Sequence, residues 1–95
     1  MKTTKVAIMN VGGNSLVSKI FFPHRIKFDS TKNNLYWCAE GDDQEFSEKV
    51  NGIKLLSRSH KQLEVELTTC RKVLQFSDSS EFQLWNKLLS SAIYN

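Results

Sequence analysis

The sequence contains little of what marks several common protein classes. Among 95 residues there are two cysteines, Cys38 and Cys70, which form no metal-binding pattern with each other or with His24 and His60. No signal-peptide segment is present, so we expect both thiols to be reduced inside the cell. No apolar run is long enough to span a bilayer. These absences argue against a disulfide-rich secreted domain, a zinc module and a membrane-spanning helix.

Catalytic motifs are missing as well. No histidine belongs to a recognisable motif with a nucleophile and an acid, and no Gly-x-x-x-x-Gly-Lys loop exists for a nucleotide phosphate. Five carboxylates gather in residues 40–48, where a solvated loop is a simpler interpretation than an acid–base pair. Neither cysteine stands beside residues that would activate a thiol. We therefore predict a protein that is not an enzyme and needs no metal or cofactor.

What the sequence does contain is an uneven distribution of charge. Thirteen Lys and Arg against ten Asp and Glu give a net charge of +3. Residues 1–39 hold six basic side chains and one acid, whereas residues 40–48 hold five acids and no base. The pI of about 9.0 and the basic residues near aromatic ones raise nucleic-acid binding as a hypothesis. We rank it last, because no helix-turn-helix, zinc-finger or RNA-binding signature accompanies them.

One helix is predicted over residues 78–94. Phe82, Trp85 and Leu89 recur there at spacings of three and four, which forms an apolar stripe along one helical face. Asp78 is a suitable N-cap, and an acid three residues later makes a variant of the capping box. A helix with one apolar face needs a surface to pack against, and the preceding chain predicts a sheet or barrel.

That preceding chain reads as short strands separated by polar turns. The predicted strands are 5–11, 15–22, 24–29, 35–39, 53–58, 62–69 and 71–77. Pro23 is predicted to mark an edge, a bulge or a break, and Asn51–Gly52 a turn. Residues 40–48 are predicted as a loop, with or without a short strand around Phe46. Seven mostly hairpin-connected strands and one helix indicate an antiparallel sandwich or barrel whose open end the helix covers.

The order of elements resembles the pleckstrin-homology (PH) superfold, in which seven antiparallel strands form two sheets and a C-terminal helix caps one end. RKVLQFSDSSEFQLWNKLLSSA resembles the last PH strand, a polar turn and that helix, with Trp85 at the position of the characteristic helix tryptophan. RIKFDSTKNNLYWCAEGD is similar to the second and third PH strands, especially those of the phospholipase C type. The resemblance implies a single PH-like domain over 1–95, with strands within about 4–77 and the capping helix over about 78–94.

Many PH domains bind phosphoinositide headgroups through basic residues on the first two strands, in the pattern of a Lys followed at a distance by Lys/Arg-x-Arg. The resemblance implies a headgroup site of Lys19, Arg25, Lys27 and Lys32. Lys27 departs from the usual final arginine, so it can act as a point charge but cannot form a bidentate fork. The simplest alternative for Arg25 and Lys27 is the solvated face of an alternating strand.

Other features of the sequence favour protein binding over this site. If the first PH strand is 15–22, the connection at Pro23 is very short for the family. If it is 5–11, the loop Gly12–Asn14 holds no base. The acidic residues 40–48 oppose docking on an anionic surface if they lie on the same side. A protein-interaction module would instead use a groove or a sheet edge.

We therefore predict a non-enzymatic interaction module that targets a membrane or scaffolds proteins, through phosphoinositide headgroups, a protein partner or both. The alternative is a purely protein-binding or oligomerisation domain without lipid binding, and exposed sheet edges would permit self-association. We expect a cytoplasmic location, peripheral at a membrane or a cytoskeletal structure. The large apolar side chains predicted to form the core are Trp85, Phe82, Leu89 and Trp37.

Overall fold

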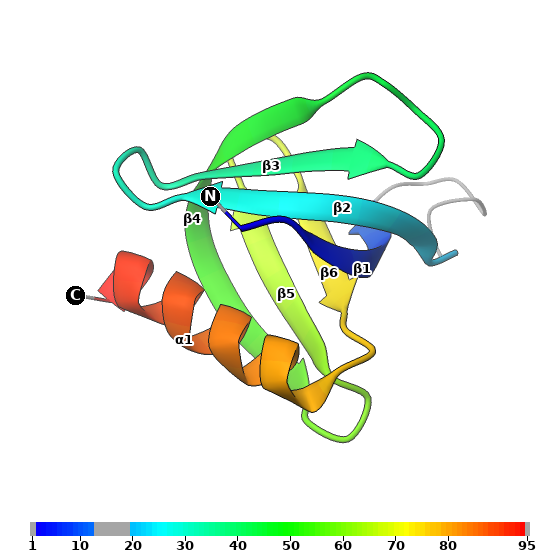
Figure 1. Ribbon diagram of the computed structural model, residues 1–95. Coiled ribbons are helices and arrows are strands. Elements are labelled where there is room, and N and C mark those ends of the chain that lie inside the picture. The colour runs from blue at the N-terminus through cyan, green and yellow to red at the C-terminus, as the bar shows by residue number, and fades with distance from the viewer. Residues whose placement is uncertain (1, 13–19, 95) are drawn as a thin grey trace.

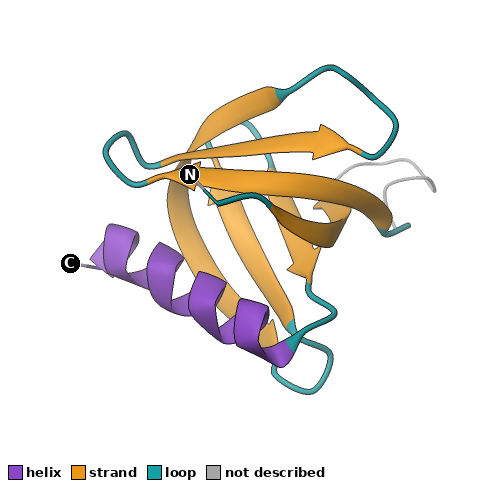
Figure 2. Cartoon of the chain, in the orientation of Figure 1, coloured by secondary structure: helices purple, strands orange, loops and turns teal. Residues whose placement is uncertain are grey.

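The computed structural model describes residues 2–12 and 20–94, which form a closed antiparallel barrel with one helix across an end (Figure 1). Figure 2 shows the same chain as strands followed by a single helix, as predicted. The elements are β1 (Thr4–Val11), β2 (Phe22–Asp29), β3 (Asn34–Ala39), β4 (Phe46–Ser57), β5 (Gln62–Leu67), β6 (Arg71–Gln75) and α1 (Ser79–Tyr94). The predicted strand 15–22 lies mostly outside the described residues, and its last residue, Phe22, begins β2.

The prediction of seven strands is wrong in number, because the described residues contain six. The difference lies in the predicted strand 15–22, which is not among the six: residues 15–19 lie outside the described residues, Ile20 and Phe21 belong to no strand, and Phe22 begins β2. The 12-residue β4 is longer than the predicted strand 53–58: residues 46–49 pair with β3, and residues 50–57 pair with β5. One strand therefore takes part in both halves of the barrel wall. The predicted turn at Asn51–Gly52 is also wrong, since the register shift between Val50 and Gly52 is a bulge that bends a continuous strand.

Pro23 lies inside β2, at a point where that strand has a partner on one side alone. It stands opposite Ala7 of β1, and the pairing of β2 with β3 begins only at His24. On the β3 side, the carbonyl of Pro23 accepts a hydrogen bond from the backbone N–H of Glu40 (3.0 Å). In an antiparallel strand, the backbone N and C=O of one residue point to the same side. Because the carbonyl of Pro23 points toward β3, its nitrogen does too, and the missing N–H of proline removes no hydrogen bond between β1 and β2.

Helix α1 covers one end of the barrel with the stripe predicted from the sequence. Phe82, Trp85 and Leu89 are buried, and Trp37 of β3 is buried in the same core. The indole Nε1 of Trp85 donates a hydrogen bond to Thr4 Oγ1 (3.0 Å), so its polar atom keeps a partner as the ring leaves water. Burial of a large apolar side chain stabilises a fold by about 1.5–3 kcal/mol. The helix is therefore an integral part of the core.

The start of α1 is fixed by a cap and by contacts with β1. Asp78 Oδ1 accepts a hydrogen bond from the backbone N–H of Ser80 (2.7 Å), which confirms the predicted N-cap. Glu81 turns to the start of β1: its carboxylate lies 2.8 Å from Lys2 Nζ and accepts a hydrogen bond from Thr4 Oγ1 (3.3 Å). These contacts define which flank of the helix faces β1.

Closure of the barrel leaves fewer free edges than the sequence suggested. β1 pairs with β6, from Ala7 opposite Gln75 to Val11 opposite Arg71. Among the described strands, the longest stretch with a neighbour on one side alone is residues 52–57 of β4, which pair with β5 after β3 has ended. We call these residues the β4 edge. Helix α1 packs against this half of β4 (Figure 1).

Candidate functional site

The structure brings together two of the residues predicted to bind a headgroup. Arg25 and Lys27 both point outward from β2, because the alternate residues of that strand are buried in the barrel. Lys32 lies in the exposed turn beyond the end of β2. Lys19 falls outside the described residues. Arg25 and Lys27 thus share one surface, and Lys32 is placed away from them.

The acidic residues 40–45 form the loop from β3 to β4, and this loop folds over the outside of β2. Glu45 Oε2 lies 3.0 Å from Lys27 Nζ, and the same Nζ lies 5.6 Å from the centroid of the Tyr36 ring. A hollow of about 390 Å³ lies between loop and strand, lined by Thr3, Arg25, Lys27, Cys38, Asp42, Asp43 and Glu45. We call this surface the β2 face. Its three carboxylates outnumber its two cations.

A thiol ties the acidic loop to the strand before it. Cys38 Sγ donates a hydrogen bond to the backbone carbonyl of Asp42 (3.1 Å). Gln44 N–H also donates to Asp42 Oδ1 (3.1 Å), so the loop is partly shaped by its own side chains. The loop therefore has local contacts that hold its carboxylates near β2.

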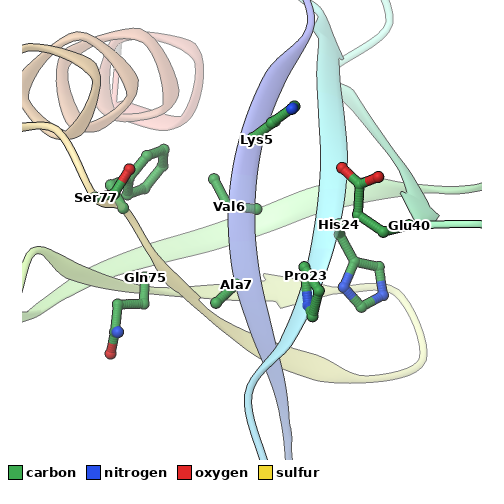
Figure 3. Close-up of a pocket in the computed structure, with 9 residues that line it drawn as sticks. Lys5, Val6, Ala7, Pro23, His24, Glu40, Gln75 and Ser77 are labelled. Atoms are coloured by element: carbon green, nitrogen blue, oxygen red, sulfur yellow. The ribbon is translucent and has the colours of Figure 1, made fainter.

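Another hollow, of about 260 Å³, lies on the outside of the barrel across β6, β1 and β2 (Figure 3). Ala7 and Pro23 stand opposite each other in the β1–β2 ladder, and their small side chains leave space above the strands. Lys5 and Glu40 lie at the rim in Figure 3. One base and one acid balance each other, so this hollow suits an apolar group better than an anion.

The end of the barrel opposite α1 contains a buried lysine that we did not predict. Lys72 is 8% exposed and turns inward from β6, as Leu74 and Phe76 do. Its Nζ donates a hydrogen bond to Asn10 Oδ1 (2.6 Å) and lies 4.7 Å from the centroid of the Trp37 ring. Among the described residues, no carboxylate lies within 4.0 Å of it. The alternation of β6 was the signal that could have revealed it.

Burial lowers the pKa of Lys72, because desolvation disfavours the ammonium form, while Cys70 and Glu48 act in the opposite direction. Glu48 is itself held by Thr69, whose hydroxyl and backbone N–H donate to its two carboxylate oxygens (2.6 and 2.8 Å). These two hydrogen bonds lower the pKa of Glu48. Glu48 is thus engaged by Thr69, and Lys72 has no carboxylate within 4.0 Å in the described residues.

A hollow of about 370 Å³ opens beside Lys72, and we call it the barrel mouth. It is lined by Ile8, Asn10, Ile20, Phe22, His24 and Lys72. Two of its lining side chains are large, apolar and exposed: Ile20 is 63% exposed and Phe22 50%. Phe46 of β4, which is 47% exposed, does not line the hollow. Phe46 stacks on Trp37, with ring centroids 6.1 Å apart. The mouth therefore combines an apolar rim with one buried cation.

Residues 2–12 and 20–94 contain neither a metal-binding cluster nor a helix that could span a membrane. No group of three or more His, Cys, Asp or Glu side chains there is placed to hold a metal ion. The one helix of that part of the chain falls short of the length and apolarity that crossing a membrane requires. The surfaces with distinctive chemistry are the β2 face, the barrel mouth and the β4 edge.

Comparison with known proteins identifies the fold. No protein-family model matches the sequence, and no curated protein matches it either. The structure is similar to the crystal structure of the pleckstrin homology domain of ArhGAP27, with a TM-score of 0.72 over 98% of this chain and 99% of that one. The two sequences are 12% identical, so the likeness concerns the fold. The prediction of a PH-like superfold is confirmed: this chain folds as a pleckstrin homology domain does.

Proposed function

We propose that the chain is a non-enzymatic, PH-like interaction module whose ligand is a protein. The observation that carries this proposal is the β2 face. There Glu45 lies 3.0 Å from Lys27, and Asp42 and Asp43 share a hollow with Arg25. The two cations that a headgroup would need are already opposed by three carboxylates of the same chain.

Electrostatics explain why this arrangement favours a protein over a phosphoinositide. A headgroup brings several negative charges and would meet the acidic loop before it met Arg25 or Lys27. Like charges brought together at an interface cost several kcal/mol. A protein surface can present both signs in register with both signs of the β2 face. The site predicted at Lys19, Arg25, Lys27 and Lys32 stays a prediction, and the first experiment addresses it directly.

The lipid arm of the test is an NMR titration of the isotope-labelled domain with inositol hexakisphosphate and with vesicles that contain phosphoinositides. We expect no saturable shift at Arg25 or Lys27 at millimolar inositol phosphate, and the same result for Arg25→Ala/Lys27→Ala. Saturable shifts that cluster at these two residues and vanish in the double variant would overturn the proposal. The protein arm is a selection of displayed random peptides on the domain, where we expect enrichment.

A second candidate is an anionic membrane lipid bound at the barrel mouth. Lys72 has no direct counterion, and the exposed Phe22 and Phe46 could enter the membrane interface beside it. Such binding would place a cytoplasmic domain at a membrane surface. Vesicle binding that is lost in Phe22→Ser and Lys72→Gln, but kept in Arg25→Ala/Lys27→Ala, would favour this candidate over the protein ligand.

A further inference from the structure

We propose that the β2 face and the hollow at Ala7 and Pro23 form one docking surface for an extended segment of a partner protein, which carries an apolar side chain with an acid and a base close to it. We call the hollow at Ala7 and Pro23 the β1–β2 hollow (Figure 3). The inference rests on the proposed function and names the surface and the class of ligand. It follows from the position of the two hollows, the apolar floor of one and the charges around both.

The two hollows adjoin along the outer side of β2. Pro23 lines the β1–β2 hollow, and the next outward residues of the same strand, Arg25 and Lys27, line the hollow of the β2 face. Lys5 stands opposite Arg25 in the β1–β2 ladder and lines the β1–β2 hollow. Two residues of an extended chain span about 6.6 Å, so a partner segment would pass from one hollow to the other within about three residues.

The floor of the β1–β2 hollow is apolar, because the small side chains of Ala7 and Pro23 face outward there. Two polar groups that line the same hollow already have partners. Gln75 Oε1 accepts a hydrogen bond from Gln62 Nε2 (2.8 Å), and His24 Nδ1 donates one to a backbone carbonyl of its own strand (2.7 Å). An apolar side chain placed on this floor would leave water without depriving these groups of a partner.

The acidic loop runs alongside β2 and is attached to it at both ends. At its start, the Pro23 carbonyl accepts a hydrogen bond from the Glu40 N–H (3.0 Å). At its end, Glu45 forms an ion pair with Lys27 (3.0 Å). The loop therefore follows the strand from Pro23 to Lys27, and its carboxylates form a row beside the bases of β1 and β2.

Most charges in these two rows have no close partner within residues 2–12 and 20–94. Lys5 and Arg25 have no carboxylate within 4.0 Å there. Glu40, Asp42 and Asp43 have no basic nitrogen within that distance. A partner acid over the bases and a partner base over the acids would each meet an opposite charge, whereas a ligand of one sign would be repelled by one of the rows. The surface therefore selects a segment with both signs.

The test starts from random peptides displayed on phage and selected on the full domain. We expect the enriched peptides to carry an apolar residue with both an acid and a base within about three residues of it. Ala7→Phe fills the β1–β2 hollow from the outer side of β1 and should weaken their binding by at least about tenfold. Met9→Phe is the matched control, because Met9 is the next outward residue of β1 and lines neither hollow.

A second measurement keeps the test decisive if Ala7→Phe lowers stability. Lys5→Glu/Arg25→Glu should weaken the binding of an enriched peptide by at least about tenfold, and exchange of the peptide's acid for lysine should restore binding to this variant. A change in the peptide does not repair a misfolded domain. Lys54→Glu/Lys87→Glu makes the same change of net charge at exposed residues of β4 and α1, and should leave binding within about twofold of wild type.

The outcomes separate this inference from the proposed function. Enriched peptides that bind Ala7→Phe and Lys5→Glu/Arg25→Glu as well as wild type, or that shift the NMR signals of β4 and not those of β1 and β2, overturn the docking surface and leave the protein-binding function standing. Enriched peptides with charges of one sign alone, or without an apolar residue, overturn the predicted ligand class. Failure to enrich any peptide, together with vesicle binding, overturns the proposed function itself.

Discussion

The β2 face and the β4 edge carry the same kinds of cation in opposite circumstances. Lys27 on the β2 face contacts Glu45. Lys54 at the β4 edge and Arg58 just after it have no carboxylate within 4.0 Å in the described residues, although Glu64 stands opposite Lys54 in the β4–β5 ladder. Topology produces the difference, because the acidic loop after β3 folds over β2, while β4 bends away from β3 toward β5. Net charge alone would not show this. The charge that can attract a partner is what remains after the chain's own pairs are accounted for.

This comparison also assigns a role to the acidic loop. The side chains of Lys27 and Glu45 are 32% and 43% exposed, and an ion pair in such surroundings contributes roughly 0–1 kcal/mol to stability. The loop therefore matters more for the electric potential of the β2 face than for the fold. Its removal should change what the domain binds and leave its stability nearly unchanged.

The largest effect that we expect is a loss of stability when the core contact of α1, the helix that borders the β4 edge, is removed. Trp85→Ala removes a buried indole and its hydrogen bond to Thr4, and should lower the free energy of unfolding by about 3–5 kcal/mol. Urea denaturation measures this, with Leu84→Ala as the exposed control, expected within about 0.5 kcal/mol of wild type. A loss below about 1 kcal/mol for Trp85→Ala, which is less than an unfilled cavity of that size costs, would show that α1 packs loosely.

Neutralising the acidic loop should make the β2 face resemble the β4 edge. Asp42→Asn/Asp43→Asn/Glu45→Gln leaves Arg25 and Lys27 without carboxylate neighbours. Inositol hexakisphosphate, which we expect not to bind the wild-type β2 face at millimolar concentration, should bind this variant measurably at low salt, because exposed charges each contribute up to about 1 kcal/mol. Isothermal titration calorimetry at two salt concentrations checks both the gain and its screening.

The matched control for that variant removes acids from another face. Glu64→Gln/Glu66→Gln lowers the acid content of β5, which does not pair with β2 or β3, and should leave inositol phosphate binding undetected, as in wild type. An equal gain in both variants would mean that net charge, and not the position of the loop, governs anion binding.

Local patterns in the sequence predicted the parts of the fold that depend on local rules. The buried apolar face of α1 follows from the helical period of its residues. Its N-cap follows from Asp78, whose side chain reaches a backbone N–H of the first turn. The alternation of β2 placed Arg25 and Lys27 outward. In each case the residues that decide the structure are neighbours in the chain.

The features that sequence reasoning missed depend on contacts between distant segments. The residues Asn51–Gly52 favour a turn locally. β4 nevertheless continues through them, because its first half pairs with β3 and its second half pairs with β5. Lys72 is polar by type, yet it turns inward because Leu74 on the same face is core. The sequence alone does not place the acidic loop on either side of the sheet, and only the folded chain brings Glu45 to Lys27.

A smaller effect concerns Lys72, a buried cation with no carboxylate within 4.0 Å in the described residues. Desolvation lowers the pKa of Lys72 in the folded state, so the unfolded chain binds more protons between that lowered pKa and the ordinary value of about 10.4. Stability should therefore rise with pH across this window. Lys72→Met removes that contribution and should leave the domain as stable as wild type or about 1 kcal/mol more stable at neutral pH.

Urea unfolding at a series of pH values measures this difference, and Lys54→Met on the exposed β4 edge is the control that corrects for the general loss of a lysine. If wild type and Lys72→Met lose or gain stability in parallel as the pH rises, Lys72 is hydrated in solution and its burial carries no cost. If Lys72→Met is destabilised at neutral pH, the bond to Asn10 and the contact with Trp37 outweigh the desolvation.

The smallest effect concerns the bend in β4 from which the β4 edge begins. A Cβ on Gly52 would meet Glu66 Oε1 at 3.0 Å, the mobile end of an exposed side chain that can move aside. Gly52→Ala should therefore be neutral or stabilise the fold by up to about 0.5 kcal/mol. Gly12 has a φ of +86°, so Gly12→Ala should destabilise by about 1 kcal/mol. Thermal unfolding compares the two, and a loss at Gly52 as large as that at Gly12 would mean that Glu66 is fixed and that the bend itself requires glycine.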